Sequence, residues 1–198
     1  MFKRICKITF ITHGETVYSI NGIINNNIKS PKLNEFGEEE IGQVCDYLKK
    51  RGVAYDKIYT SPNACCTQSA QIIARMFKKK PEVIDLLPRR YGDWHGTSVI
   101  ELFKEYGTKI LAQTPKNGEA LEVFNKRVDE YVSKLISKNQ GSRIIVVTTP
   151  DVVQSALAKA LELSPENQYK NLIKTGSLTQ ISYFEGWSSV IYSDYKPL

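Results

Sequence analysis

Two histidines, His13 and His95, and two adjacent cysteines, Cys65 and Cys66, are the side chains of this chain best suited to act as nucleophiles or proton carriers. His13 lies within Thr12-His13-Gly14-Glu15-Thr16, directly after an apolar run. An imidazole titrates near neutral pH, so a positioned histidine can attack an electrophile or move a proton there. Taken alone this segment is a weak signal, because a histidine at the end of a strand often has only a structural role.

The elements that flank His13 predict where it lies. Apolar residues dominate 5–11, which predicts a strand that ends just before His13. The β-branched run 144–147 predicts a second strand, covered on both faces and therefore central in a sheet. Ligands of parallel sheets bind beyond the carboxyl ends of the strands. We therefore expect His13 and the Thr148-Thr149-Pro150 turn to lie at the same edge.

The remaining chain alternates predicted strands and helices without an internal repeat or a low-complexity linker. This alternation predicts one domain over residues 1–198, an α/β fold with three α/β/α layers and a mostly parallel central sheet. The patterns predict further strands at 57–60 and 82–87, a closing hairpin of 178–183 with 189–192, and helices at 34–52, from 61 onward, and at 98–106, 118–137 and 151–161.

Composition narrows the function classes. The chain has 198 residues, 41% of them hydrophobic, and a net charge of +6. Basic residues are spread along the chain and do not alternate with stacking aromatics, which argues against a nucleic-acid partner. No stretch approaches the ~20 apolar residues of a membrane span. The four cysteines lack metal-type spacing, and two are adjacent, so we expect no disulfide framework, no metal site and a cytoplasmic location.

Several blocks of sequence occur in an order that resembles the histidine phosphatase superfamily, which includes the phosphoglycerate mutases. The first strand and its His-Gly-Glu-Thr motif are followed by a Leu-x-x-x-Gly stretch, a Tyr-x-Ser block, a Gly-x-Trp-x-Gly loop, a Pro-x-x-Gly-Glu turn and the central strand. In this chain the blocks are 12–16, 33–37, 59–70, 92–96, 115–119 and 144–148.

The resemblance implies phosphoryl transfer through a phosphohistidine, with His13 as the nucleophile and Glu15 retained beside it. The family mechanism uses no metal and no organic cofactor. Members of the family surround the phosphoryl group with two arginines and a second histidine, because fixed donors must stabilise its negative charge. A Glu or Asp protonates the leaving oxygen.

Four of these positions differ here. The two arginine slots hold Thr12 and Cys65, the second histidine slot holds Thr149, and the acid slot holds Pro88. In one branch of the family an Asp directly follows the second histidine, but here Pro150 intervenes before the next Asp, which makes the match poor.

Three residues are candidates to restore the lost functions. Arg89 and Arg90 directly follow the acid slot and would return positive charge if they turned inward; otherwise they are basic surface residues flanking a loop. His95 would serve as a relocated acid or phosphate ligand, or is a polar loop residue. Cys65 beside Cys66 is a further candidate nucleophile, although buried cysteines are usually inert.

The sequence therefore predicts a histidine phosphatase-like protein with lost or strongly reduced phosphoryl transfer, retained for binding or regulation around His13. The alternative is an active phosphomonoester phosphatase, or less plausibly a mutase, that uses Arg89, Arg90 and His95 in substitute roles. Either reading favours a phosphorylated small molecule or another anion as the ligand, and neither specifies an oligomeric state.

Overall fold

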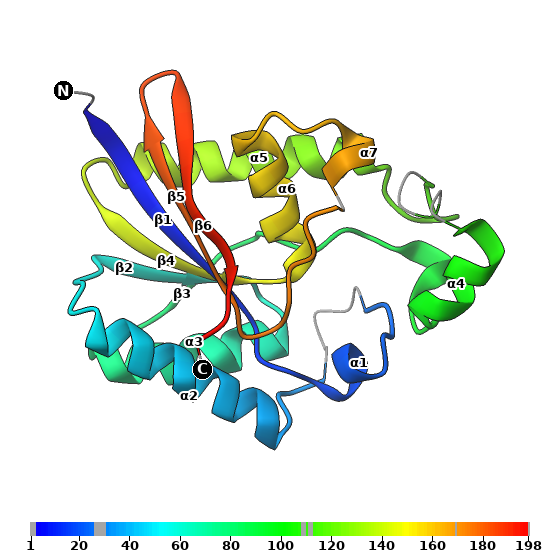
Figure 1. The fold of residues 1–198 in the computed structure, drawn as a ribbon, viewed down its shortest axis with the longest axis horizontal. Coiled ribbons are helices and arrows are strands. Elements are labelled where there is room, and N and C mark those ends of the chain that lie inside the picture. The colour runs from blue at the N-terminus through cyan, green and yellow to red at the C-terminus, as the bar shows by residue number, and fades with distance from the viewer. Residues whose placement is uncertain (1–2, 26–30, 108–109, 111–112, 169, 198) are drawn as a thin grey trace.

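The computed structural model describes residues 3–25, 31–107, 110, 113–168 and 170–197. Its centre is a six-stranded sheet in the order β3-β2-β4-β1-β5-β6 (Figure 1). The central pair is parallel, as predicted, and Thr12 at the end of β1 lies opposite Thr148 at the end of β4. The strands are β1 (Arg4–Thr12), β2 (Lys57–Thr60), β3 (Glu82–Val83), β4 (Arg143–Thr148), β5 (Leu178–Phe184) and β6 (Trp187–Tyr195).

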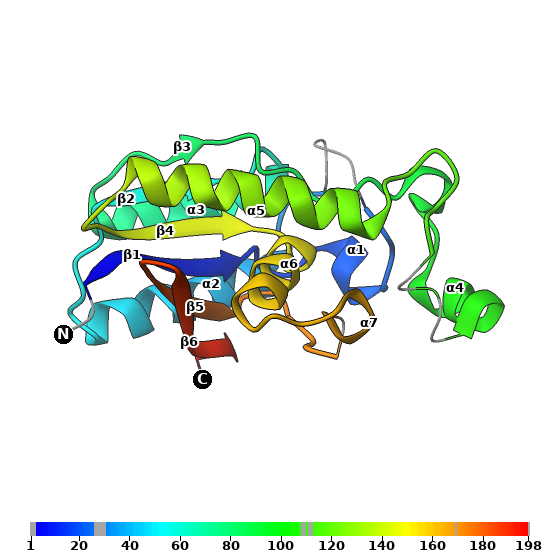
Figure 2. The ribbon, with the colours of Figure 1, turned by 90° about the horizontal axis from the view of Figure 1, so that it is seen from above.

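Helices cover both faces of the sheet, which confirms the three-layer α/β/α architecture (Figure 2). One face packs against α2 (Glu35–Lys50) and α3 (Ala64–Phe77), and the other against α5 (Leu121–Lys138) and α6 (Pro150–Ala160). The predicted closing hairpin is also present, because β5 and β6 pair antiparallel and β5 runs antiparallel to β1. The short helix α7 (Pro165–Gln168) follows α6.

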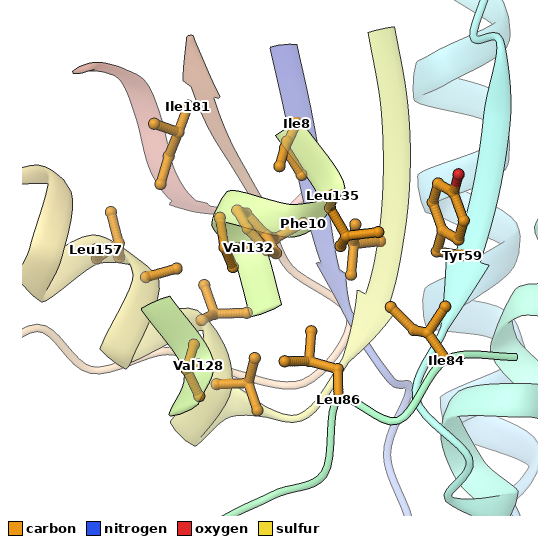
Figure 3. Close-up of a cluster of buried hydrophobic side chains, with 14 of the residues drawn as sticks. Ile8, Phe10, Tyr59, Ile84, Leu86, Val128, Val132, Leu135, Leu157 and Ile181 are labelled. Atoms are coloured by element: carbon orange, nitrogen blue, oxygen red, sulfur yellow. The ribbon is translucent and has the colours of Figure 1, made fainter. Parts of the chain in front are cut away.

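The side chains of β1 point alternately to the two faces of the sheet and so belong to two separate clusters of the hydrophobic core. Ile8 and Phe10 face the α5–α6 side, where they meet Val132 and Leu157 (Figure 3), and Ile11 faces the α2–α3 side. All of these side chains are at most 5% exposed. Burial of a Val, Leu, Ile or Phe side chain contributes about 1.5–3 kcal/mol, so each layer is strongly held against the strand that carries His13.

Two predicted boundaries were wrong. The expected strand at 82–87 is ordered as a strand only at Glu82–Val83, because β2 ends at Thr60 and offers no ladder partner farther on. The helix expected from Gly118 begins at Leu121. Gly118 packs against the backbone of Arg90, where an added Cβ would lie 2.8 Å from the Arg90 carbonyl oxygen, so this stretch forms a loop contact.

A separate structure lies beyond the carboxyl ends of β1 and β4, which we call the cap and define as residues 16–25 and 91–107. It contains α1 (Val17–Ile20) and α4 (Val99–Tyr106), and α4 projects away from the sheet (Figures 1 and 2). Backbone hydrogen bonds join its two segments, from Ile24 N to Thr97 O at 3.0 Å and from Val99 N to Gly22 O at 2.8 Å. None of the helices in the described part of the chain is long and apolar enough to cross a membrane.

Candidate active-site cavity

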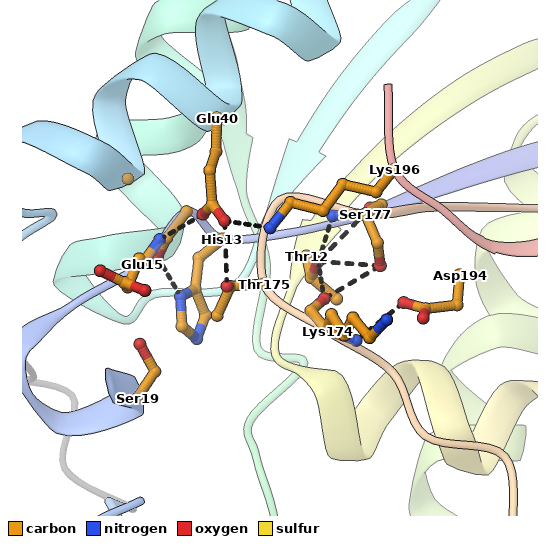
Figure 4. Close-up of polar contacts among 12 residues, drawn as sticks. Thr12, His13, Glu15, Ser19, Glu40, Lys174, Thr175, Ser177, Asp194 and Lys196 are labelled. Carbon is orange, nitrogen blue, oxygen red and sulfur yellow. Dashed lines mark hydrogen bonds and ion pairs between the residues drawn. The ribbon is translucent and has the colours of Figure 1, made fainter. Parts of the chain in front are cut away.

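His13 follows directly after β1, and its backbone N–H donates to the Thr148 carbonyl of β4 at 3.1 Å. The imidazole is 8% exposed, and its Nδ1 lies 2.8 Å from the Gly14 carbonyl oxygen (Figure 4). A carbonyl only accepts hydrogen bonds, so Nδ1 carries the proton in this contact. Nε2 is therefore the ring nitrogen left to act as nucleophile or base.

A close approach between two backbones holds the His13 loop in place. A Cβ added to Gly14 would lie 2.1 Å from the carbonyl oxygen of Gly37, in the first turn of α2. The Gly14 N–H also donates to the Ser69 hydroxyl of α3 at 3.2 Å. The glycines of the His-Gly-Glu-Thr and Leu-x-x-x-Gly blocks are thus two sides of one contact, which only residues without a side chain permit.

Glu15 lies beside this contact and binds the start of α2. Its Oε1 accepts from the Asn34 side-chain amide at 2.9 Å, and its carbonyl accepts from the Asn34 N–H at 3.1 Å. The Glu15 N–H donates to Oε2 of the buried Glu40, which also forms an ion pair with Lys196 (Figure 4). Glu15 is not among the residues that line the cavity between the sheet edge and the cap, so its contacts support a positioning role.

A cavity of about 410 Å³ opens between the carboxyl edge of the sheet and the cap. This volume is within the range of small-molecule sites, ~300–1,000 Å³. His13, Thr16 and Asn63 contribute polar groups to its wall, whereas most of the cap residues in the wall are apolar or aromatic. The apolar and aromatic part of the wall consists of Tyr18, Ile23, Ile24, Pro88, Tyr91, Trp94, Val99, Phe103, Ile110 and Pro150.

Three of the four altered slots face this cavity, and one does not. Cys65, Pro88 and Thr149 line the wall. Thr12 is 1% exposed and lies outside the wall, because its hydroxyl donates to the Lys174 carbonyl at 2.6 Å and accepts from the Ser177 N–H at 2.9 Å. The Thr12 hydroxyl thus links the end of β1 to the segment that enters β5.

Among the three candidate replacements, only Arg89 reaches the cavity wall. It is 1% exposed, with Nε donating to the Glu119 carbonyl at 2.9 Å and Nη2 to the Gln113 carbonyl at 2.7 Å. Arg90 and His95 are exposed and lie outside the wall. The inward turn considered for Arg89 therefore occurs, but its guanidinium binds backbone carbonyls.

A second arginine supports the same wall from behind. Arg127 forms a two-pronged ion pair with Glu119, at 2.8 Å and 2.9 Å, and also donates to the carbonyls of Leu87 and Pro88. Burial alone would raise the pKa of Glu119, but the bonds from Arg127 and from the Arg90 N–H hold it below its usual value. Glu119 is therefore ionised near neutral pH and fixes the segment that carries Pro88 and Arg89.

Asp151 also lines the cavity, although Pro150 separates it from the position at which the family pattern has an acid. Pro150 is the first residue of α6, so Asp151 lies in the first helical turn at the end of β4, which returns it to the cavity. Its Oδ2 accepts from the Arg89 N–H at 2.7 Å, and its Oδ1 accepts from the Thr149 hydroxyl and the Val152 N–H.

These neighbours change the protonation of His13. Burial by itself lowers the pKa of an imidazole, but interactions with Cys65, with the Gly14 carbonyl and with the Asp151 carboxylate outweigh it, and the pKa of His13 is raised. All four cysteines lie within the described residues and carry thiols rather than disulfides. No group of three or more His, Cys, Asp or Glu in the described part of the chain is arranged to hold a metal ion.

The sequence matches the family model of the histidine phosphatase superfamily, branch 1, over residues 8–193. It is 30% identical to a 2,3-bisphosphoglycerate-dependent phosphoglycerate mutase of Thermoplasma acidophilum, over 86% of this chain and 84% of that protein. It is 27% identical to phosphoglycerate mutase-like protein 4 of Arabidopsis thaliana, over 97% and 86% of the two chains.

Solved structures share the fold at low identity. Phosphoserine phosphatase from Entamoeba histolytica, in complex with 3-phosphoglyceric acid, superposes with a TM-score of 0.86 at 21% identity, covering 96% of this chain and 98% of that one. A putative α-ribazole-5'-phosphate phosphatase from Escherichia coli superposes with a TM-score of 0.83 at 19% identity, covering 98% of each chain.

Proposed function

The chain belongs to branch 1 of the histidine phosphatase superfamily. We propose that this member has lost phosphoryl transfer or retains it only weakly, and that its cavity binds a largely apolar small molecule. The relatives named above carry phosphatase and mutase names. The proposal for this chain differs from those names because of what surrounds its nucleophile.

The observation that carries the proposal is the charge around His13. In the described wall of the cavity, Arg89 is the one Lys or Arg side chain, and two of its donors bind backbone carbonyls. Asp151 adds a carboxylate to the same wall. A transferring phosphoryl group spreads negative charge over its oxygens and needs fixed positive donors. This wall offers one positively charged side chain and one opposing charge.

Magnitudes support a severe loss. Removal of one fixed donor for a developing negative charge costs about 100- to 1,000-fold in rate. Loss of a general acid costs about 100- to 10,000-fold, although such effects do not add. The slots at Cys65, Thr149 and Pro88 lack a cation or a proton-donating acid in the family positions. We therefore expect turnover below detection in ordinary assays.

The first prediction concerns this turnover. Purified protein is assayed against p-nitrophenyl phosphate and a panel of phosphomonoesters, beside His13→Ala. We expect the two proteins to release phosphate at the same background rate, because the charge that would stabilise the transition state is missing. Turnover that His13→Ala abolishes would contradict the proposal.

A matched control separates the two histidines. His95 is exposed and outside the cavity wall, so His95→Ala keeps the site intact. Any residual activity that belongs to the protein itself should survive in His95→Ala and disappear in His13→Ala. Activity lost equally in both variants would indicate a contaminant or a folding defect.

The second prediction concerns the apolar wall. Phe103 and Ile100 of α4 are both exposed, at 53% and 65%, but only Phe103 lines the cavity. We expect the probe 8-anilino-1-naphthalenesulfonate to gain fluorescence on binding, and Phe103→Asp to weaken its affinity at least about 10-fold, because an apolar contact in the cavity wall is replaced by a charge. Ile100→Asp should leave the affinity within about 2-fold. Equal effects of the two variants would show that the probe binds elsewhere.

The alternative function is an active phosphomonoester phosphatase, favoured by the intact orientation of His13. Its Nδ1 is bound by Gly14, which leaves Nε2 for attack, and Asp151 is available in the wall as an acid. This alternative predicts an acid-labile phosphoryl group on His13 after incubation with substrate. It also predicts that Asp151→Asn reduces turnover while inorganic phosphate raises the melting temperature.

A further inference from the structure

Cys65 stands where the cavity meets the amino-terminal end of a long helix. It is the second residue of α3 and is 3% exposed, and it lines the cavity together with His13. Cys66, its neighbour, is fully buried and does not line the cavity. The helix dipole favours negative charge at this end of α3, which promotes the thiolate form of a cysteine there.

His13 and Cys65 line the same cavity, and interactions with the Cys65 side chain are among the causes that raise the pKa of His13. Because Nδ1 of His13 donates to the Gly14 carbonyl, the ring nitrogen left to accept a thiol proton is Nε2. In this tautomer Nε2 accepts the thiol proton. A nucleophile bonded to a base that a third group orients is the arrangement by which enzymes activate thiols.

The groups around the pair act mainly on His13. The Asp151 carboxylate, from α6, interacts favourably with a protonated His13, and the Gly14 carbonyl holds the proton on Nδ1. Arg89 also lines this cavity, and Cys66 contacts Cys65 from within α3. Burial keeps the pKa of the Cys66 thiol high, so Cys66 stays protonated.

We propose that Cys65 and His13 form a nucleophile–base pair that hydrolyses carboxylic esters or thioesters with an apolar acyl group. A carbonyl carbon is neutral and needs no cationic frame, so this chemistry fits a wall that lacks phosphate-binding arginines. The choice of an apolar acyl group rests on the apolar cavity of the proposed function. The reactivity of the Cys65 thiol does not rest on the proposed function.

The reaction balances with water as the only co-reactant. The Cys65 thiol proton moves to Nε2 of His13, and Sγ bonds to the carbonyl carbon. The bond from that carbon to the leaving oxygen or sulfur breaks, and the leaving group takes the proton from Nε2. Water then attacks the acyl carbon while His13 accepts its proton, the carbon–sulfur bond breaks, and the acid is released as the thiol is restored.

The first experiment measures thiol reactivity by alkylation. Full-length protein is treated with iodoacetamide between pH 5.5 and 8.5, and each cysteine is followed by mass spectrometry with fragmentation. For an ion-paired thiolate we expect the Cys65 rate to fall less than about 3-fold from pH 8 to pH 6. Cys45 is more exposed, but burial and Asp46 raise its pKa to about 11, so its rate should fall about 10-fold per pH unit.

Two outcomes of this experiment decide for or against the pair. The pair is supported if Cys65 is labelled preferentially and nearly independently of pH. In His13→Asn the rate of Cys65 labelling at pH 6 should then fall by at least about 10-fold, and in His95→Asn it should not. Labelling of Cys65 no faster than Cys45, or with the same 10-fold dependence on pH, overturns it. The wild-type profile alone decides this point if His13→Asn fails to fold.

The second experiment tests acyl transfer. With p-nitrophenyl butyrate we expect a burst of about one p-nitrophenolate per protein and a butyryl group on Cys65, both absent in Cys65→Ala and retained in Cys45→Ala. No adduct on Cys65 in the wild type, or an equal burst in Cys65→Ala, overturns the proposal. Neither readout depends on phosphoester turnover or on probe binding, so the proposed function and this inference can fail separately.

Discussion

Thr12, at the end of β1, forms hydrogen bonds that hold this end of the strand in place. At this position the superfamily pattern has an arginine beside the nucleophile, and this chain has a short hydroxyl that bonds to Lys174 and Ser177 instead. The hydroxyl joins β1 to the segment that enters β5. Thr12 therefore contributes to the stability of the fold at the end of β1.

The bonds of this hydroxyl predict a measurable difference between two small substitutions. Thr12→Val keeps the shape but leaves the Lys174 carbonyl and the Ser177 N–H without this partner, which costs about 1–3 kcal/mol. Thr12→Ser keeps the hydroxyl and removes one methyl group, which costs about 1 kcal/mol. Urea unfolding should therefore rank Thr12→Val as the less stable variant. The reverse order would show that the methyl group matters more than the bonds.

At the scale of elements, the site depends on how α2 meets the end of β1. Gly14 and Gly37 allow the two backbones to touch, and Glu15 and Asn34 tie the loop to the first turn of the helix. His13 is positioned by this junction. The two glycine-containing blocks that resemble the family pattern thus meet a packing requirement.

This junction predicts opposite effects for two glycine-to-alanine changes. In Gly14→Ala the new Cβ would lie 2.1 Å from the Gly37 carbonyl oxygen, so the backbones must separate, and we expect a loss of at least about 2 kcal/mol. Gly42 lies inside α2 with no atom within 4 Å of an added Cβ. Gly42→Ala should therefore stabilise the protein by about 0.5–1 kcal/mol. Both changes are measured by the free energy of unfolding, and a neutral Gly14→Ala would refute the close contact.

The sequence predicted these elements well where local pattern decides them. The runs that became β1 and β4 are apolar or β-branched, and the runs at 178–183 and 189–192 flank the turn Glu185-Gly186-Trp187, so their strands were predictable. The run at 82–87 has similar residues but ended as a short β3, because a strand needs a partner and β2 stops at Thr60. Partner length is a tertiary property that no local pattern contains.

The candidate site was predictable in part for the same reason. The position of His13 at the strand end followed from the pattern around it. The direction of the Arg89 side chain did not, because it depends on the carbonyls of Gln113 and Glu119, some 24 and 30 residues away in the chain. Asp151 was present in the sequence, but only the start of α6 at Pro150 shows that it faces the cavity.

The whole molecule combines a tightly packed sheet with a loosely packed cap. Five of the six residues of β4 are buried, whereas α1 has no buried residue and α4 has only Leu102. The cavity lies between these two parts, so its floor is fixed by the core and its outer wall by the cap. Ligand-binding segments are commonly drawn from the less stable parts of a fold.

This contrast predicts a gradient in amide hydrogen exchange. Amides of β1 and β4 should open only with global unfolding, while those of α1 and α4 open locally, so their protection factors should differ by at least about 1,000-fold, or about 4 kcal/mol.

A probe bound in the cavity, such as 8-anilino-1-naphthalenesulfonate, should slow exchange in the cap and leave β4 unchanged, because only the cap has local opening to suppress. Phe103→Asp should remove this protection and Ile100→Asp should keep it. Exchange of α4 as slow as that of β4 in the unbound protein would mean that the cap is part of the rigid core, and binding would then have to occur without local opening.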